Sequence, residues 1–407
     1  MFFLRKYFPY VIILLNLFGT LALENRIGIY ILYPTQIIIG VSSLFYYLKH
    51  YKSLHLKYPY ISFLYVVMLF YVLVGFIKQF FILSGIFPFV RMSISMAFLS
   101  IGSYFFIADR VILTRILKLW MKWVPVLFVV FYFILYQSQY GSYFHFYSLF
   151  VLLFPLLILQ KKLIIVIISV FLLTSGIIQR MDIISILLPI LIALAYSSGL
   201  LKNKYVFLWL NKAIIAIPIV FFLLALTTSF NVLAIDKYIG DYSLDSGDKL
   251  NVDTRSFLYQ ESYESAKKNN YILWGRTPLY GYDSYWQMGY GSLISDSYKP
   301  VNGVCQRGSE VFIVNIFTWC GVIGVIFFFI FFYKVSHRAI LSSNNVYMKV
   351  LGLYVSCFWV IDWFGNNMWG LNMSYILLFI IVGMIYSPFY MKMTNREFEI
   401  YFREILK

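Results

Sequence analysis

Arginines and carboxylates crowd into one polar stretch of this chain. Residues 235–310 contain ten of the 17 acidic residues, together with Arg255, Arg276 and Arg307. The guanidinium group presents a planar, two-pronged set of N–H donors that fits phosphate oxygens. Several arginines on one face beside a membrane would suit a lipid-linked pyrophosphate. The alternative is that these arginines only form weak ion pairs with neighbouring acids.

Two further positions could belong to the same chemistry. Arg180 and Asp182 interrupt an apolar region. An arginine at membrane depth is costly and usually faces a cavity or an anionic partner, although it could also reach the interface or pair with Asp182. Arg307 and Glu310 form the best-placed pair of the polar stretch, because they directly precede an apolar run.

Other kinds of site are not indicated. The three cysteines and four histidines form no C-x-x-C or H-x-x-x-H pair, and no phosphate-binding glycine loop is present. We therefore expect no metal, cofactor or nucleotide. Asp362 is a further candidate acid or base. Aromatic residues of the polar stretch could stack on sugars or form an interfacial belt, and the composition favours the belt. These residues are Tyr271, Trp274, Tyr280, Tyr282, Tyr285, Trp286 and Tyr290.

The elements that position these residues must lie in lipid. The chain is 61% hydrophobic and 12% charged, with a mean hydropathy of +0.80. Its apolar runs are continuous, which predicts helices and not barrel strands. We expect an all-α polytopic membrane protein with about twelve spans, at 7–23, 28–48, 60–81, 87–108, 122–138, 143–160, 163–179, 182–199, 212–234, 311–333, 346–364 and 368–388.

The spans predict three parts. Residues 1–234 hold nine spans, 235–310 form the long polar loop, and 311–407 hold three spans and a tail. The net charge of +16 comes from basic residues in short connections, which favours membrane topology and not nucleic acid as its explanation. These basic clusters all fall on one side, so both termini are expected in the cytoplasm and the long loop outside.

Three shorter helices are also predicted. Thr254–Asn269 should be helical, with Thr254 as N-cap, an apolar face of Phe257, Leu258, Tyr259 and Tyr263, and Lys267 and Lys268 at its C-terminal end. The segment Arg110–Trp123 reads equally as a helix on the inner leaflet or as a helical connector between spans. Asn395–Lys407 should form a similar amphipathic helix.

The layout and two blocks of residues resemble the bacterial O-antigen polymerases of the Wzy type, within the O-antigen polymerase and ligase superfamily. The first block is Gln179-Arg180-Met181-Asp182. The second runs from Arg255 through Trp274-Gly275-Arg276 to Arg307-Gly308-Ser309-Glu310, Gly321 and Gly324. The chain departs from the polymerase pattern at Ala266 and Gln287, where glycine often stands. It also lacks the loop histidine of ligases.

The resemblance implies a GT-C-like membrane glycosyltransferase of the bacterial cytoplasmic (inner) membrane, independent of metal. It would polymerise undecaprenyl-pyrophosphate-linked repeats into O-antigen, the polysaccharide of lipopolysaccharide, or a capsule-type polymer. Arg180, Arg255, Arg276 and Arg307 would bind pyrophosphate, and Glu310, Asp182 or Asp253 would be the base, Glu310 first. The implied partners are this glycan, membrane lipid and a chain-length regulator protein. An O-antigen ligase and a flippase for the same lipid-linked sugar remain alternatives.

Overall fold

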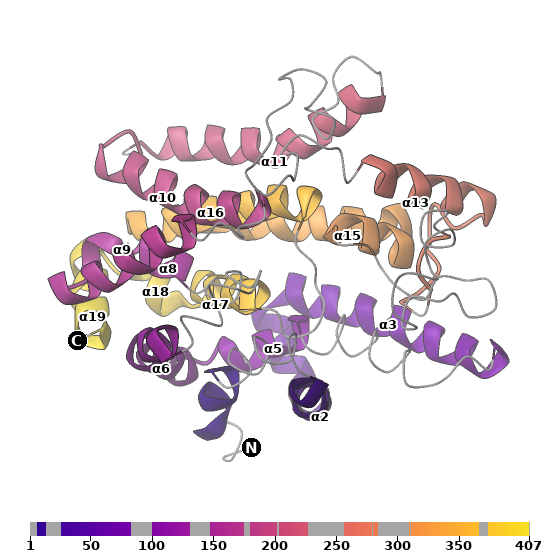
Figure 1. The fold of residues 1–407 in the computed structure, drawn as a ribbon, viewed down its shortest axis with the longest axis horizontal. Coiled ribbons are helices and arrows are strands. Elements are labelled where there is room, and N and C mark those ends of the chain that lie inside the picture. Colours follow the sequence, from indigo (N-terminus) through magenta and orange to yellow (C-terminus); the bar gives the residue numbers. More distant parts are fainter. Residues whose placement is uncertain are drawn as a thin grey trace.

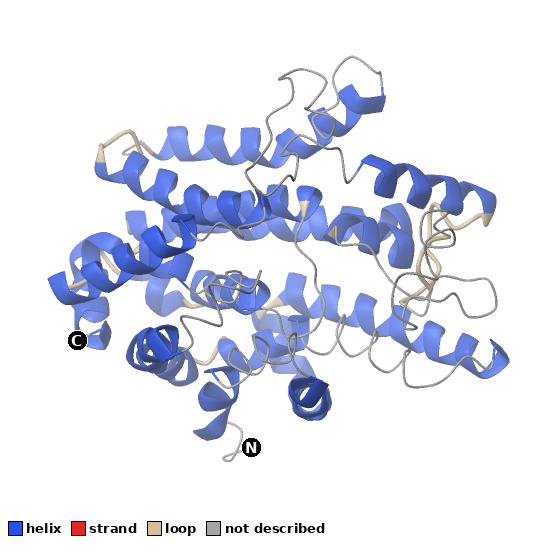
Figure 2. Cartoon of the chain, viewed as in Figure 1, coloured by secondary structure: helices blue, strands red, loops and turns tan. Residues whose placement is uncertain are grey.

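The computed structural model describes residues 6–13, 26–82, 100–130, 147–174, 180–201, 203–226, 256–278, 280–283, 309, 311–365 and 373–406. Within these residues the secondary structure is helical, with no strand (Figure 2). In the described part of the chain, four helices have the length and apolar composition to cross a membrane: Pro59–Lys78, Lys204–Leu224, Phe312–Ser342 and Val346–Phe364. The chain is therefore a helical membrane protein.

The helices follow one another along the chain (Figure 1) in this order: α2 (Arg26–Lys57), α3 (Pro59–Ile82), α5 (Ser100–Ile107), α6 (Arg110–Val130), α8 (Tyr147–Leu152), the short 3-10 helix η3 (Phe154–Leu156), α9 (Leu159–Thr174), α10 (Arg180–Ser197), α11 (Lys204–Leu226), α13 (Ser256–Lys268), α15 (Phe312–Ser342), α16 (Val346–Phe364), α17 (Met373–Tyr386), α18 (Pro388–Lys392) and α19 (Asn395–Leu406).

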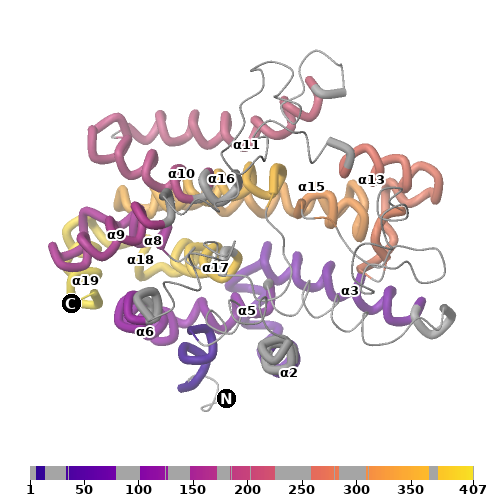
Figure 3. The backbone as a smooth tube through the Cα atoms, in the orientation of Figure 1, coloured from indigo at the N-terminus to yellow at the C-terminus, as the bar shows by residue number. Residues whose placement is uncertain are grey.

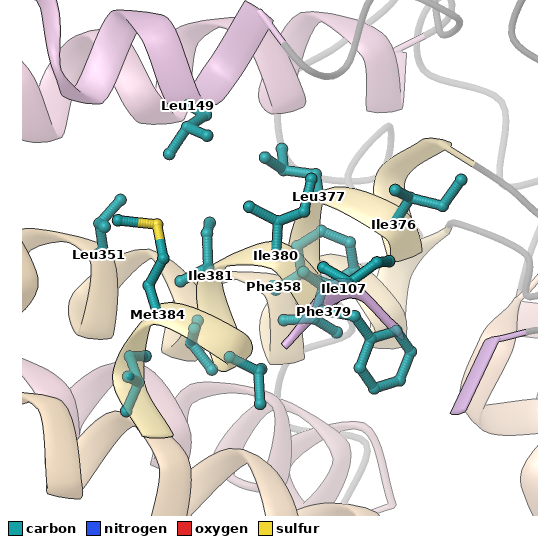
Figure 4. Close-up of a cluster of buried hydrophobic side chains, with 14 of the residues drawn as sticks. Ile107, Leu149, Leu351, Phe358, Ile376, Leu377, Phe379, Ile380, Ile381 and Met384 are labelled. Atoms are coloured by element: carbon teal, nitrogen blue, oxygen red, sulfur yellow. The ribbon is translucent and has the colours of Figure 1, made fainter. Parts of the chain in front are cut away.

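The core surrounds α17. Every described side chain from Tyr375 to Tyr386 is buried, which suits a helix that is apolar on all faces. Figure 4 shows this cluster of side chains from α17, α16, α8 and α5: Ile376, Leu377, Phe379, Ile380, Ile381, Met384, Leu351, Phe358, Leu149 and Ile107. By contrast, most side chains of α11 are not buried within the described part of the structure.

Several expected spans match single helices, and others differ. Residues 346–364 are predicted and observed with the same bounds. The expected span 311–333 continues as α15 to Ser342, since Lys334 and Arg338 mark the end of the apolar run but do not stop a helix. Helix α6 runs from Arg110 through Val130 without a break, so the basic segment continues into the fifth expected span. Residues 83–99 and 131–146 lie outside the described part.

The C-terminal helix is docked by its apolar face. Phe398, Phe402, Ile405 and Leu406 of α19 are buried, as its amphipathic sequence predicts. The guanidinium carbon of Arg110 in α6 lies 3.5 Å from the centre of the Phe389 ring, and the hydroxyls of Thr114 and Tyr401 are 3.0 Å apart. In Figure 1, α19 and α13 lie at opposite ends of the molecule.

Helix α15 contains one break, at Gly321. This glycine has a φ of 66° and a ψ of −166°, far from helical values. A Cβ atom placed there would lie 2.2 Å from the carbonyl oxygen of Leu273. The positive φ and the close approach of another segment both require glycine. The break exposes backbone groups that lipid cannot satisfy.

We predict that Gly321→Ala destabilises the protein by on the order of 3 kcal/mol, because it combines a strained φ with a backbone clash. The thermal unfolding midpoint of the purified protein in detergent should fall sharply. The matched control is Val322→Ala, one residue on, which shortens an exposed side chain and leaves the backbone conformation unchanged. Equal midpoints for the two variants would contradict this account of the break.

Candidate functional site

Residues 271–277 of the polar stretch satisfy the backbone groups at the break in α15. The N–H groups of Arg276 and Thr277 donate to the carbonyl oxygens of Thr318 and Trp319, over 2.8 and 3.0 Å. In return, the N–H groups of Val322 and Ile323 donate to the carbonyl oxygens of Ile272 and Leu273, over 2.9 and 3.4 Å.

A third carbonyl at the break is satisfied by a different helix. The Tyr71 hydroxyl of α3 donates to the carbonyl oxygen of Cys320 over 3.2 Å. The exchange of hydrogen bonds therefore fixes the polar segment, α15 and α3 relative to one another, at the end of the molecule that carries α13 (Figure 3).

Two backbone positions in the docked segment are unusual. Gly275 has a φ of 72°, and a Cβ atom there would lie 2.3 Å from the backbone of Trp319. Thr277 is a β-branched residue with a φ of 79°, a conformation such residues rarely adopt. Both lie where the segment meets α15, so the hydrogen bonds across this contact hold the backbone in that shape.

Helix α13 approaches α15 through small side chains. Ser262, Ser265 and Ala266 are buried, and the Ser262 hydroxyl lies 3.2 Å from that of Thr318. Of the apolar face expected for this helix, Leu258 is buried, whereas Tyr263 is 54% exposed. The small residues permit a close approach that a tyrosine would prevent. Thr254 and the side chain of Phe257 lie outside the described residues.

Arg276 closes the docked segment with its side chain. Its Nη1 lies 2.8 Å from Oδ1 of Asp283 and donates to the carbonyl oxygen of Gly281 over 3.1 Å. The guanidinium carbon also lies 5.0 Å from the centre of the Tyr271 ring and 5.6 Å from that of Tyr280. We call this group of Arg276, Asp283, Tyr271 and Tyr280 the arginine clasp.

Neighbouring polar groups complete the clasp. Asn269 donates to the other oxygen of Asp283 over 2.8 Å. The Tyr271 hydroxyl donates to the Ser265 hydroxyl over 2.6 Å, and the latter also accepts from the Asp283 N–H at 2.9 Å. Burial raises the pKa of Tyr271, with the Arg276 charge opposing it. The Tyr271 hydroxyl therefore stays protonated at neutral pH and acts as a donor.

The last turn of α16 holds a buried carboxyl group. Asp362 is fully buried, and its Oδ1 accepts a hydrogen bond from the Tyr375 hydroxyl of α17 over 2.9 Å. The ring of Phe312, in the first turn of α15, lies 5.5 Å from that of Tyr375. Nearby, Asn315 donates to the Ser309 carbonyl over 2.7 Å, which fixes the chain on both sides of position 310.

The predicted site residues fall into three groups. Arg276 is described in full and forms the clasp. Arg180 and Asp182 lie in the first turn of α10, while their side chains lie outside the described part. The other four lie wholly outside the described residues: Asp253, Arg255, Arg307 and Glu310. Among the described residues, no group of three or more histidines, cysteines or carboxylates could hold a metal.

Some of this arrangement leaves a trace in the sequence. The glycine in Trp274-Gly275-Arg276 marks the turn, and Gly321 marks the break. Nothing in the sequence indicates that Asp283, out of the ten acids of the polar stretch, is the partner of Arg276. The contributions of Tyr71 and Thr318 come from distant helices with no distinguishing pattern.

Comparisons with protein-family models, curated proteins and solved structures find no match to this chain.

We predict that Arg276 and Asp283 are energetically coupled. Each partner is less than one quarter exposed, so Arg276→Gln and Asp283→Asn should each destabilise the protein, with a coupling free energy of about 1 kcal/mol. A double-mutant cycle on thermal unfolding measures it. The exposed pair Gln260 and Glu264 of α13 provides a matched control cycle with little coupling. Additive effects at Arg276 and Asp283 would show that the clasp contributes nothing as a pair.

Proposed function

We propose that this protein is a polysaccharide polymerase that joins undecaprenyl-pyrophosphate-linked oligosaccharide repeats at the outer face of a bacterial cytoplasmic membrane. The proposal includes about twelve spans in a GT-C-like arrangement, both termini in the cytoplasm, and the polar segment outside. Its product would be an O-antigen or a capsule-type polymer.

One observation carries this proposal. The polar segment between α11 and α15 is docked onto a broken membrane helix, at the end of the molecule opposite to the α19 end (Figure 1). A polar wall held rigidly against the ends of apolar helices suits an enzyme whose substrate has a lipid tail and a soluble sugar-phosphate head. A flippase has no need for such a wall, because it would bind its cargo between its spans.

The proposed reaction makes two physical demands. The acceptor sugar hydroxyl attacks the anomeric carbon of the donor glycan, the bond to undecaprenyl pyrophosphate breaks, and the hydroxyl proton passes to a carboxylate. Preorganised cations must stabilise the departing pyrophosphate. We assign that role to Arg180, Arg255 and Arg307, with Arg276 beside them, and the proton to Glu310 first, or to Asp182 or Asp253.

Arg276 has a second role in this proposal. Its clasp with Asp283 fixes the segment that follows the docked turn. Since its Nη1 already donates to Asp283 and Gly281, we expect Arg276 to contribute less to pyrophosphate affinity than the other three arginines do.

We predict that deletion of the encoding gene leaves a surface glycan of single repeats, and that Arg180→Ala fails to restore the polymer. Removing a preorganised donor to developing charge typically costs about 100-fold to 1000-fold in rate. Gel electrophoresis of surface polysaccharide from complemented strains measures the chain-length ladder.

The matched control is Arg403→Ala, which removes an exposed arginine from α19 and should restore a normal ladder. A normal ladder with Arg180→Ala would contradict the role of Arg180. Loss of all surface repeats in the deletion strain, in place of a single-repeat band, would contradict the polymerase and favour a ligase or flippase.

A further inference from the structure

Four lysines from three helices gather where α11 begins, α15 ends and α16 begins. The Lys204 ammonium group of α11 donates to the carbonyl oxygen of Leu341 in α15 over 3.3 Å. Lys349 lies in the first turn of α16, which follows the end of α15 directly. Lys334 lies two turns before Leu341 in α15, and Lys212 lies about two turns after Lys204 in α11. We call Lys204, Lys212, Lys334 and Lys349 the lysine cluster.

The lysine cluster is a single surface feature. Helices α11 and α15 pack against each other, and Lys334 and Leu341 lie two turns apart on the same face of α15, so Lys334 and the residue that Lys204 contacts share that face. Lys204, Lys212 and Lys334 are exposed, and Lys349 is partly exposed. All four ammonium groups can therefore be reached from outside the protein.

Positive charge in the cluster has no partner among the described carboxylates. None of the four lysines forms an ion pair within the part of the chain that the structure describes. Like charges held close together repel one another and destabilise the fold. Membrane topology requires basic residues on one side of the membrane, but it does not require them to converge from three helices.

The surroundings of the cluster indicate the class of anion. Beside the lysines, α11 presents Tyr205 and Trp209 to the outside, 70% and 73% exposed. Exposed tryptophan and tyrosine at the end of an apolar helix are typical of the membrane interface, at the level of the lipid headgroups. The Lys212 ammonium group lies 5.5 Å from the centre of the Trp209 ring, so charge and ring occupy the same depth.

We infer that the lysine cluster binds the phosphate headgroup of an anionic phospholipid in the leaflet that faces it, while the acyl chains lie along the exposed apolar surface of α11. A lipid fits this place better than a soluble anion, because the neighbouring exposed side chains are apolar and aromatic. This site lies at the α19 end of the molecule, away from the clasp (Figure 1), and it does not depend on the proposed function.

Native mass spectrometry of the full-length protein in a neutral detergent tests this inference, with phosphatidylglycerol as the anionic probe and phosphatidylcholine as the neutral one. The protein should retain phosphatidylglycerol preferentially. A lysine near an anionic lipid surface contributes about fivefold in affinity, so Lys204→Gln with Lys349→Gln, and Lys212→Gln with Lys334→Gln, should each weaken phosphatidylglycerol binding by about that factor per lysine.

The matched control is the pair Lys161→Gln and Lys162→Gln in α9, two further lysines whose chain position predicts the same leaflet. This pair should change the affinity by less than about twofold, because these lysines lie outside the cluster. Equal losses from the control and the cluster variants would overturn the site. So would equal retention of both lipids by the unmodified protein.

Two further measurements keep the test decisive. Lys204→Arg with Lys349→Arg should retain binding, since the charge remains, and raised salt should weaken phosphatidylglycerol binding to the unmodified protein. If a glutamine variant fails to fold, these two results still decide the matter, because salt-insensitive binding would contradict a charged site. Displacement of the lipid by equal concentrations of inorganic phosphate would overturn the lipid assignment in favour of a soluble anion.

Discussion

The structure depends on how backbone hydrogen bonds are completed around Gly321. A break in a helix leaves N–H and C=O groups without partners inside that helix, and each of them needs another partner. Here the chain supplies the partners from residues 272–277 and from Tyr71, so donors and acceptors are exchanged between two distant segments. The break and the docked segment are therefore one structural unit, and neither is stable in this form alone.

Other features of the polar segment follow from this exchange. The backbone of the segment can approach α15 at Trp319 because Gly275 has no side chain. The arginine clasp then closes the chain behind the docked turn and holds Asp283 against the end of α13. The segment that would form one wall of the proposed site is thus fixed by the membrane helices and by its own side chains.

The sequence predicts much of the architecture. Apolar runs identify most of the described helices, because length and hydropathy alone decide whether a segment suits a bilayer. For α16, both predicted ends are the observed ones. Helix ends are harder, as α15 and α6 show, since a change in polarity marks the membrane boundary while the helix itself continues. The polar segment is also recognisable, and so is the helical character of Ser256–Lys268.

Tertiary partners could not be predicted in the same way. Arg276 has ten acids within its own stretch, and only the folded turn selects Asp283. Tyr71 is one of many tyrosines in apolar helices, and its role arises from its position beside Cys320.

The central claim is that residues 272–277 and the α15 break are hydrogen-bonded to each other. Hydrogen–deuterium exchange of the membrane-embedded protein tests it most directly. The amides of Arg276, Thr277, Val322 and Ile323 should exchange slowly, at rates like those of the α15 interior. Rapid exchange of Arg276 and Thr277 alongside a protected α15 would contradict it.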